Sequence, residues 1–268
     1  VEQFGGVRQC FVDGDDFIDA AFLKHLLDAS DRGASDLTVA GKLFCDRFPP
    51  DKIPALPTCG IFLRREFPLK NNLEFPEGIH PCEDGLFSHF VLALTEKISF
   101  CPEAVYHYRQ HEQGNHHQIR KRTADILPMI PRWLSLIEEF YEQRHLWKRK
   151  AGHLVRFIEH EPFELRLLGM PFSPPEQEIL YSIIRDFLTA HCTAAECRRA
   201  SLHLPFRLLL QSSGFSDFGR RLRRAGKNTG IRRKLLHFCP VPSWRRNGRA
   251  QLRQVREQLE EIRRNITF

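Results

Sequence analysis

The 268-residue chain, with 42% hydrophobic and 27% charged side chains, is long enough to bury one large core or two modest ones. Its sequence contains no apolar run near the roughly 20 residues that span a bilayer, and no internal repeat or low-complexity tract, which excludes membrane-spanning and repeat architectures. The eight cysteines are scattered without a C-x-x-C pair. This spacing fits neither a zinc knuckle nor a disulfide framework and indicates reduced thiols in a cytoplasm.

The formal net charge of +7 is distributed unevenly. Residues 220–264 contain fifteen Lys or Arg and three Glu, a local charge of +12 that leaves −5 for the rest of the chain. The sequence therefore predicts a mildly acidic body with a strongly basic tail, and the two parts are expected to have different tasks.

Residues 1–112 are predicted to be mixed α/β. Extended segments are expected up to Val12, at 36–45, at 59–66 (strand or short helix) and at 98–109. Helices are expected from Asp19, as the N-cap, to Ala29, and over 83–97, whose acidic start suits the positive end of a helix. The proline-rich segment 47–57 reads as a surface loop.

Beyond residue 118 the apolar residues recur at helical spacing. They continue to about Leu210, with a second helix start at the "SPPE" of 173–176. A further amphipathic helix is expected near the carboxyl end, where Leu252, Val255, Leu259 and Ile262 share one face. Three parts follow: an α/β part (1–117), a helical region (118–212) and a basic tail (213–268).

"CFVDGDDFID" (10–19) places Asp13, Asp15, Asp16 and Asp19 directly behind a short apolar strand. Such a cluster is costly unless a cation, a helix start or water absorbs the charge. A calcium loop is excluded, because counting from Asp13 puts residues unsuited to calcium at its fifth, sixth and twelfth positions. A helix N-cap with a solvated turn is one interpretation, and a D-x-D pair that binds Mg²⁺ or Mn²⁺ together with a diphosphate is another. A haloacid-dehalogenase-like phosphatase with Asp13 as nucleophile is the alternative.

Two later segments add candidate site residues. In "FPEGIHPCEDGLFSHF" (75–90), Glu83 and Asp84 open the predicted helix, where a carboxylate can accept a proton from an incoming hydroxyl. In "YHYRQHEQGNHH" (106–117), Arg109 and histidines such as His111 and His116 follow an extended segment and could contact phosphate oxygens or a metal.

In this order and spacing, the three segments resemble the family 2 glycosyltransferases of bacterial surface-polysaccharide assembly. The likeness covers about residues 4–115, and "FPEGIHPCEDGLF" with "AVYHYRQHEQGN" is its specific part. The resemblance implies an α/β fold with a GT-A-type sheet, incomplete here and followed by an all-helical region. It also implies metal-dependent, inverting transfer of a sugar from a nucleotide-diphosphate donor to a glycan or a lipid-linked acceptor.

Carried over by position, the resemblance assigns a role to each matching residue. Asp84 is the base that deprotonates the acceptor, and Glu83 helps to position that acceptor. Asp13 and Asp15 hold the donor and the Mn²⁺ or Mg²⁺ ion, with Asp16 as a further candidate, and Arg109 contacts the diphosphate.

Three departures from the family pattern qualify this reading. The family has a nucleotide-binding half of roughly ninety residues before the D-x-D strand, whereas Asp13 follows only twelve residues here, so an amino-terminally truncated and inactive or unstable fragment is expected. Gly114 stands where the family often has Ser, so the contact of this loop with the donor or the acceptor stays open. The Q-x-x-R-W signature of processive synthases is missing, which favours transfer of a single sugar.

The basic tail has two possible partners. Its Lys and Arg residues, with Trp244 and the 252–262 stripe, suit a helix on an anionic membrane surface. This predicts a cytoplasmic protein, peripheral at the inner face of the membrane. The alternative of a different class is a non-enzymatic module that binds nucleic-acid phosphates through "RRLRRAGKNTGIRRK", although the acidic body offers no continuous basic face.

Overall fold

The computed structural model describes residues 7–109, 122–201, 203–237, 253 and 257. The chain forms two compact units, Val1–Phe157 and Ile158–Phe268. The boundary expected at residue 117 lies outside the described residues. The described chain divides after Phe157 because α7 (Met129–Gln143) packs against α4 (Glu83–Leu94), where Phe140 stacks on Phe90 at 4.2 Å between ring centroids.

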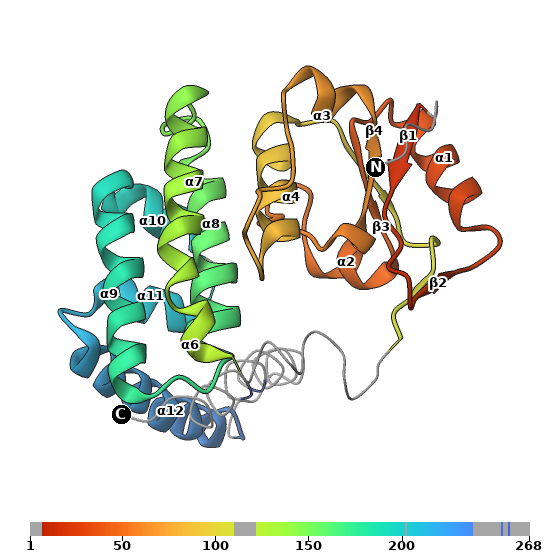
Figure 1. Cartoon of the computed structure of the whole chain (residues 1–268). Coiled ribbons are helices and arrows are strands. Elements are labelled where there is room, and N and C mark those ends of the chain that lie inside the picture. The colour runs from red at the N-terminus through yellow and green to blue at the C-terminus, as the bar shows by residue number, and fades with distance from the viewer. Residues whose placement is uncertain (1–6, 110–121, 202, 238–252, 254–256, 258–268) are drawn as a thin grey trace. The chain divides into compact units, whose positions relative to one another are not determined.

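A four-stranded sheet forms the centre of the first unit (Figure 1). Its strands are β1 (Arg8–Cys10), β3 (Leu37–Ala40), β4 (Ile61–Arg64) and β5 (Ile98–Cys101), in the order β1-β4-β3-β5. β4 is antiparallel to both neighbours, while β3 and β5 are parallel, so β1, β3 and β5 run in one direction. All four residues of β3 are buried, as expected of a strand covered on both faces.

The other elements of this unit are two short strands, a 3₁₀ turn and several helices. They are β2 (Phe17–Ile18), α1 (Phe22–Arg32), α2 (Lys42–Arg47), the 3₁₀ turn η1 (Thr58–Gly60), α3 (Glu66–Lys70), β6 (Tyr106–His107), α6 (Thr123–Ile126), α7 and α8 (Ala151–Ile158). β2 and β6 pair antiparallel in a small second sheet. α1 packs on the main sheet through Phe22, Leu26 and Ala29, which meet Ala40 and Phe62 in one buried cluster.

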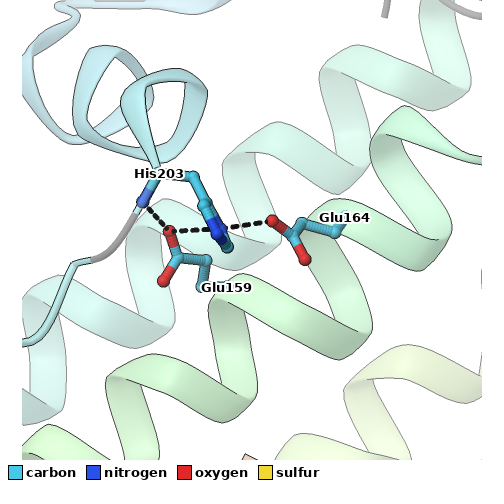
Figure 2. A group of neighbouring side chains, drawn as sticks. All are labelled: Glu159, Glu164 and His203. Carbon is cyan, nitrogen blue, oxygen red and sulfur yellow. Dashed lines mark hydrogen bonds and ion pairs between the residues drawn. The ribbon is translucent and has the colours of Figure 1, made fainter. Parts of the chain in front are cut away.

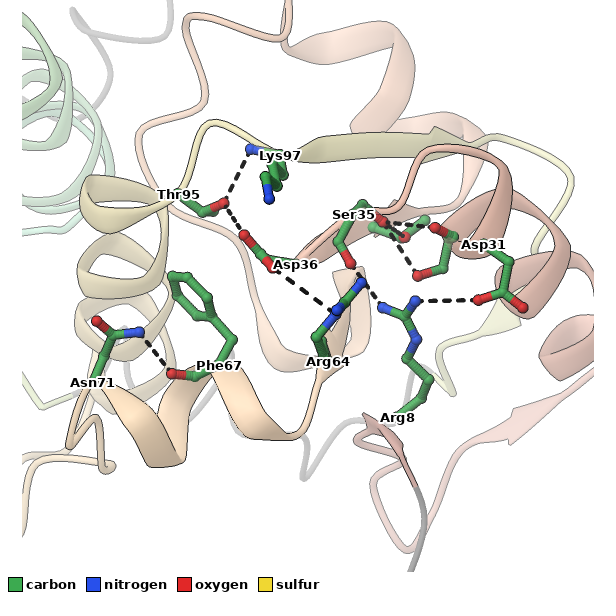
Figure 3. A network of polar contacts seen from close by, with 11 residues as sticks. Arg8, Asp31, Ser35, Asp36, Arg64, Phe67, Asn71, Thr95 and Lys97 are labelled. Carbon is green, nitrogen blue, oxygen red and sulfur yellow. Dashed lines mark hydrogen bonds and ion pairs between the residues drawn. The ribbon is translucent and has the colours of Figure 1, made fainter.

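A polar network fastens the edge of the sheet at which β3 and β5 begin (Figure 3). Asp36 accepts a hydrogen bond from Thr95 Oγ1 at 2.8 Å and lies 3.9 Å from Arg64 Nε. Arg8 donates to the carbonyl of Ser35 at 2.7 Å. Because the polar groups at this edge make structural contacts with one another, we expect a functional site at the opposite edge of the sheet.

The second unit is helical. It contains the π-helix η2 (Glu159–Leu168), α9 (Pro174–His191), α10 (Ala194–Ala200), α11 (Leu204–Gln211) and α12 (Phe215–His237). Its core contains Phe163 and Phe206, with ring centroids 5.1 Å apart, and Tyr181 stacked on Phe218. The helix start predicted at 173–176 is confirmed, since Glu176 accepts from both the backbone N–H and the hydroxyl of Ser173.

Two predicted segments differ in the structure. The extended stretch 36–45 ends at Ala40, because Gly41 takes a φ of 87° and α2 begins directly after it. The loop 47–57 is not wholly at the surface: Ile53, Ala55 and Leu56 are each at most 3% exposed. The Leu56 N–H donates to Ser88 Oγ, and the Pro54 carbonyl accepts from His89 Nδ1; these two hydrogen bonds hold the segment inside.

Candidate active site

The acidic turn, residues 13–16, is closed by a hydrogen bond from the Asp16 N–H to the Asp13 carbonyl and lies at the edge of the sheet where β1, β3 and β5 end. The register places Cys10 beside Phe62 and Ala40 beside Cys101, so these three strands finish on the same side. The predicted strand before the D-x-D pair is thus present, and Asp13 follows it by three residues. Ligands of open α/β sheets bind at the carboxyl ends of strands.

Hydrogen bonds from β6 and the residues after it shape this turn. The Tyr106 hydroxyl accepts from the Asp13 N–H at 3.1 Å and donates to Asp16 Oδ2 at 2.8 Å. The Arg109 N–H donates to Asp16 Oδ1 at 2.8 Å. Asp16 therefore ties the segment that contains Arg109 to the turn, while Asp13 and Asp15 are exposed.

Asp19 differs from its predicted role. The N-cap position of α1 is Ala21, and no side chain caps this helix. The Asp19 carboxylate instead lies 2.7 Å from His107 Nε2, and the His107 ring stacks on Phe17 at 4.4 Å. Asp19 thus joins β2 to β6 rather than starting a helix.

Glu83 and Asp84 occupy the first turn of α4, as predicted. The left-handed conformation of Cys82, with a φ of 87°, turns the chain sharply into the helix. Asp84 Oδ1 accepts from the N–H of Gly85 at 2.7 Å, and Glu83 Oε1 lies 3.1 Å from His80 Nδ1. Both carboxylates are half-buried in the first turn, at the positive end of the helix.

The structure brings the two carboxylate motifs into one neighbourhood. Burial, together with the negative charges of Asp13, Asp84 and Asp16, raises the pKa of the Cys59 thiol to about 12. Cys59 precedes β4 at the same edge of the sheet. The charges of two carboxylate motifs that the sequence separates by about seventy residues therefore act on one thiol.

An aromatic cluster connects the same two motifs independently. Phe11, two residues before Asp13, meets Phe87 of α4 edge to face, with ring centroids 6.3 Å apart. Phe75 packs against both, at 5.5 Å from Phe11 and 4.2 Å from Phe87. The contact fixes the distance between the acidic turn and the helix start by packing.

The acidic turn suits a hard divalent cation. Burial and the neighbouring Asp16 and Asp15 raise the pKa of Asp13, a concentration of negative charge that a cation would offset. The donor set consists of carboxylate oxygens, which Mg²⁺ and Mn²⁺ prefer. The residues present therefore fit the metal that the resemblance implies.

Sequence reasoning missed three residues of this site. Tyr106 and Tyr108 lie two residues apart on an extended chain, a spacing that directs both side chains to one face, so the "YHY" pattern was a usable signal in the sequence. Burial, together with the charges of Asp16, Asp15 and Asp13, raises the pKa of Tyr108. Cys59 has no sequence signal, since only the fold brings it to the carboxylates. His111 and His116 lie outside the described residues, so their role stays a prediction.

No protein-family model matches the chain, and no curated protein matches its sequence. Among solved structures, residues 1–349 of the S. aureus glycosyltransferase TarS match with a TM-score of 0.50 at 17% identity. The complex of the same TarS segment with UDP-GlcNAc matches with a TM-score of 0.54, also at 17% identity. These alignments cover 99% and 98% of this chain and 69% of each TarS chain. The likeness shows the fold: an α/β unit with part of a glycosyltransferase sheet, followed by a helical region, as predicted.

Proposed function

We propose that this chain takes part in sugar transfer as a family 2, GT-A-type glycosyltransferase. In this proposal it is metal-dependent and inverting, and it moves a single sugar from a nucleotide-diphosphate donor to a glycan or lipid-linked acceptor. The observation that carries the proposal is the packing of Phe11, two residues before Asp13, against Phe87 of α4, which holds the two carboxylate motifs close together. The complex of TarS with UDP-GlcNAc supports a nucleotide sugar as the donor.

The proposed chemistry needs one base and one displacement. Asp84 accepts the proton of the acceptor hydroxyl, and the hydroxyl oxygen attacks the anomeric carbon of the donor sugar from the face opposite the diphosphate. The new glycosidic bond forms as the bond to the diphosphate oxygen breaks, and the nucleoside diphosphate leaves. Glu83 positions the acceptor, and Arg109 contacts the diphosphate.

Asp15 and Asp13 would hold Mn²⁺ or Mg²⁺, with Asp16 fixing the turn. When bound, the ion supplies positive charge that stabilises the leaving diphosphate. The fold match to a glycosyltransferase favours this function over the phosphatase alternative with Asp13 as nucleophile.

The other predicted partners belong to the basic tail. Most of residues 238–268 lie outside the described residues, so the tail helix stays a prediction. The basic residues 220–234 lie in α12, and their binding to an anionic membrane surface or to nucleic acid also stays a prediction. Within the described part of the chain, no helix combines the length and apolarity needed to cross a bilayer.

The test is metal-dependent binding of UDP-GlcNAc and UDP to the full chain by calorimetry. We expect Mn²⁺ to strengthen binding, and Asp15→Ala to remove that strengthening. Asp28→Ala is the matched control, because Asp28 is an exposed carboxylate on α1 paired with Lys24. If binding is unaffected by metal, or if Asp28→Ala weakens it as much as Asp15→Ala, the assignment of the acidic turn is wrong.

A further inference from the structure

The second unit contains a cluster of side chains that sugar transfer does not use. Its helix η2 is a π-helix of ten residues, a rare form that occurs frequently at functional sites. Glu159 and Glu164 lie five residues apart on it, and Figure 2 shows both side chains directed at His203, which precedes α11. We call Glu159, Glu164 and His203 the η2 triad.

The contacts within the η2 triad are short. His203 Nδ1 lies 2.6 Å from Glu164 Oε1 and 3.5 Å from Glu159 Oε1. The backbone N–H of His203 also donates a hydrogen bond to Glu159 Oε1 at 2.8 Å. A fourth group, His160 Nδ1, lies 3.6 Å from Glu164 Oε2. One ligand atom from each triad member lies within 4.8 Å of the other two.

The burial of the triad differs from that of ordinary surface carboxylates. The Glu159 side chain is 2% exposed and Glu164 24% exposed, while His203 at 36% leaves a route from solvent. The ring and the backbone N–H of His203 are the contacts of these two carboxylates within the triad. Buried charge of this kind is stable only when paired or coordinated to a metal.

We propose that the η2 triad is a binding site for a divalent transition metal of the Zn²⁺ class. Two carboxylates and one imidazole nitrogen form the mixed donor set that such ions accept, and water can complete the coordination. The ion would join η2 to the start of α11. Its role is structural, because it connects two helices of one unit.

The spacing agrees with this proposal. Zn²⁺ binds imidazole nitrogen and carboxylate oxygen at about 2.0–2.2 Å, so tetrahedral ligands lie about 3.3–3.5 Å from one another. The separation of His203 Nδ1 from Glu159 Oε1, 3.5 Å, already has this length. The contact between His203 Nδ1 and Glu164 Oε1, at 2.6 Å, is shorter and must lengthen when the ion binds.

The test is titration of the full chain with Zn²⁺ against a competing chelator. We expect one equivalent of Zn²⁺ to bind at least roughly tenfold more weakly after Glu159→Gln, Glu164→Gln or His203→Gln. The matched controls His25→Gln, in α1, and Glu178→Gln, exposed on α9, should bind like the unaltered chain. Saturating Zn²⁺ should also raise the unfolding temperature of the unaltered chain by about 5 °C, and that of the triad variants much less.

Free cysteines require a second readout, because Zn²⁺ also binds thiolates. Co²⁺ in the unaltered chain should give the visible bands of nitrogen and oxygen coordination without thiolate-to-cobalt charge transfer, and this needs no variant to fold. If the unaltered chain binds no Zn²⁺, if the triad variants bind it equally, or if thiolate bands dominate, the triad is only a structural ion pair and the proposal is overturned.

Discussion

At the scale of single residues, the four aspartates of the acidic segment divide between two tasks. Asp16 accepts from Tyr106 and the Arg109 N–H, and Asp19 contacts His107, so both join the acidic segment to β6 and the residues after it. Asp13 and Asp15 are exposed after the end of β1 and are the pair that we propose as metal ligands. Identical residue types thus have a structural role at two positions and a proposed ligand role at the other two.

Asp84→Asn tests the proposed base. The amide keeps the size of the side chain and can still accept from the Gly85 N–H, but it cannot take a proton from the acceptor. We expect sugar transfer from UDP-GlcNAc, measured as UDP release with acceptor, to fall by about 10²–10⁴-fold. Donor affinity should change little. An equal loss of donor binding would show that Asp84 has a structural role.

Tyr106→Phe tests the bridge that shapes the acidic turn. Removing the hydroxyl leaves the Asp13 N–H and one Asp16 oxygen without this partner, at a cost of about 1 kcal/mol in the free energy of unfolding. Mn²⁺-dependent donor binding should weaken with it, because the turn loosens. Unchanged metal-dependent binding in a stably folded Tyr106→Phe chain would contradict the role of this bridge.

At the scale of elements, a buried polar stack joins α4, α7 and α8. The His89 ring stacks on His153 at 4.2 Å, and the Tyr141 hydroxyl lies 3.1 Å from His89 Nε2 and 3.3 Å from His153 Nδ1. His89 Nδ1 is 3.0 Å from the carbonyl of Pro54, which anchors the buried loop. The packing of these three helices therefore requires that the imidazoles of His89 and His153 stay neutral.

This stack predicts a loss of stability in mild acid. Burial lowers the pKa of His89 to about 3 and holds that of His153 well below its usual value. In the unfolded chain these histidines bind a proton near pH 6.5. The neutral stack therefore contributes its full stability above that pH, and the free energy of unfolding declines as the pH falls toward 3. Between pH 6.5 and 5, His89 alone should remove roughly 2 kcal/mol.

Urea unfolding followed by tryptophan fluorescence measures this effect, because Trp133 lies buried on α7 in the same unit. His89→Gln should flatten the dependence on pH over this range. A free energy of unfolding that stays constant from pH 7 to 5 in the unaltered chain would contradict the neutral stack.

The elements also show what the sequence could predict. Helix α4, the strand before Asp13 and the helices beyond 122 follow from periodicity and charge at helix starts. The burial of 53–56 could not be predicted, because Ser88 and His89, more than thirty residues away, satisfy its backbone. Asp19 was expected to cap α1, since the competing partner His107 is adjacent only in the fold.

At the scale of the whole molecule, two units carry two independent proposals. The first contains the acidic turn and the start of α4, and the second contains the η2 triad. About a third of the TarS segment aligns with no part of this chain. The candidate site could be predicted as far as its carboxylates, while Cys59 and the Phe11–Phe87 contact required the fold.

The most direct measurement is a crystal structure of the chain with UDP-GlcNAc and Mn²⁺, in which anomalous scattering locates the ion. We expect the anomalous peak to place the ion within coordination distance of Asp15 or Asp13 and of the diphosphate, with the Asp84 carboxylate facing the sugar. A diphosphate bound elsewhere, or an Asp84 that faces away from the bound sugar, would contradict it.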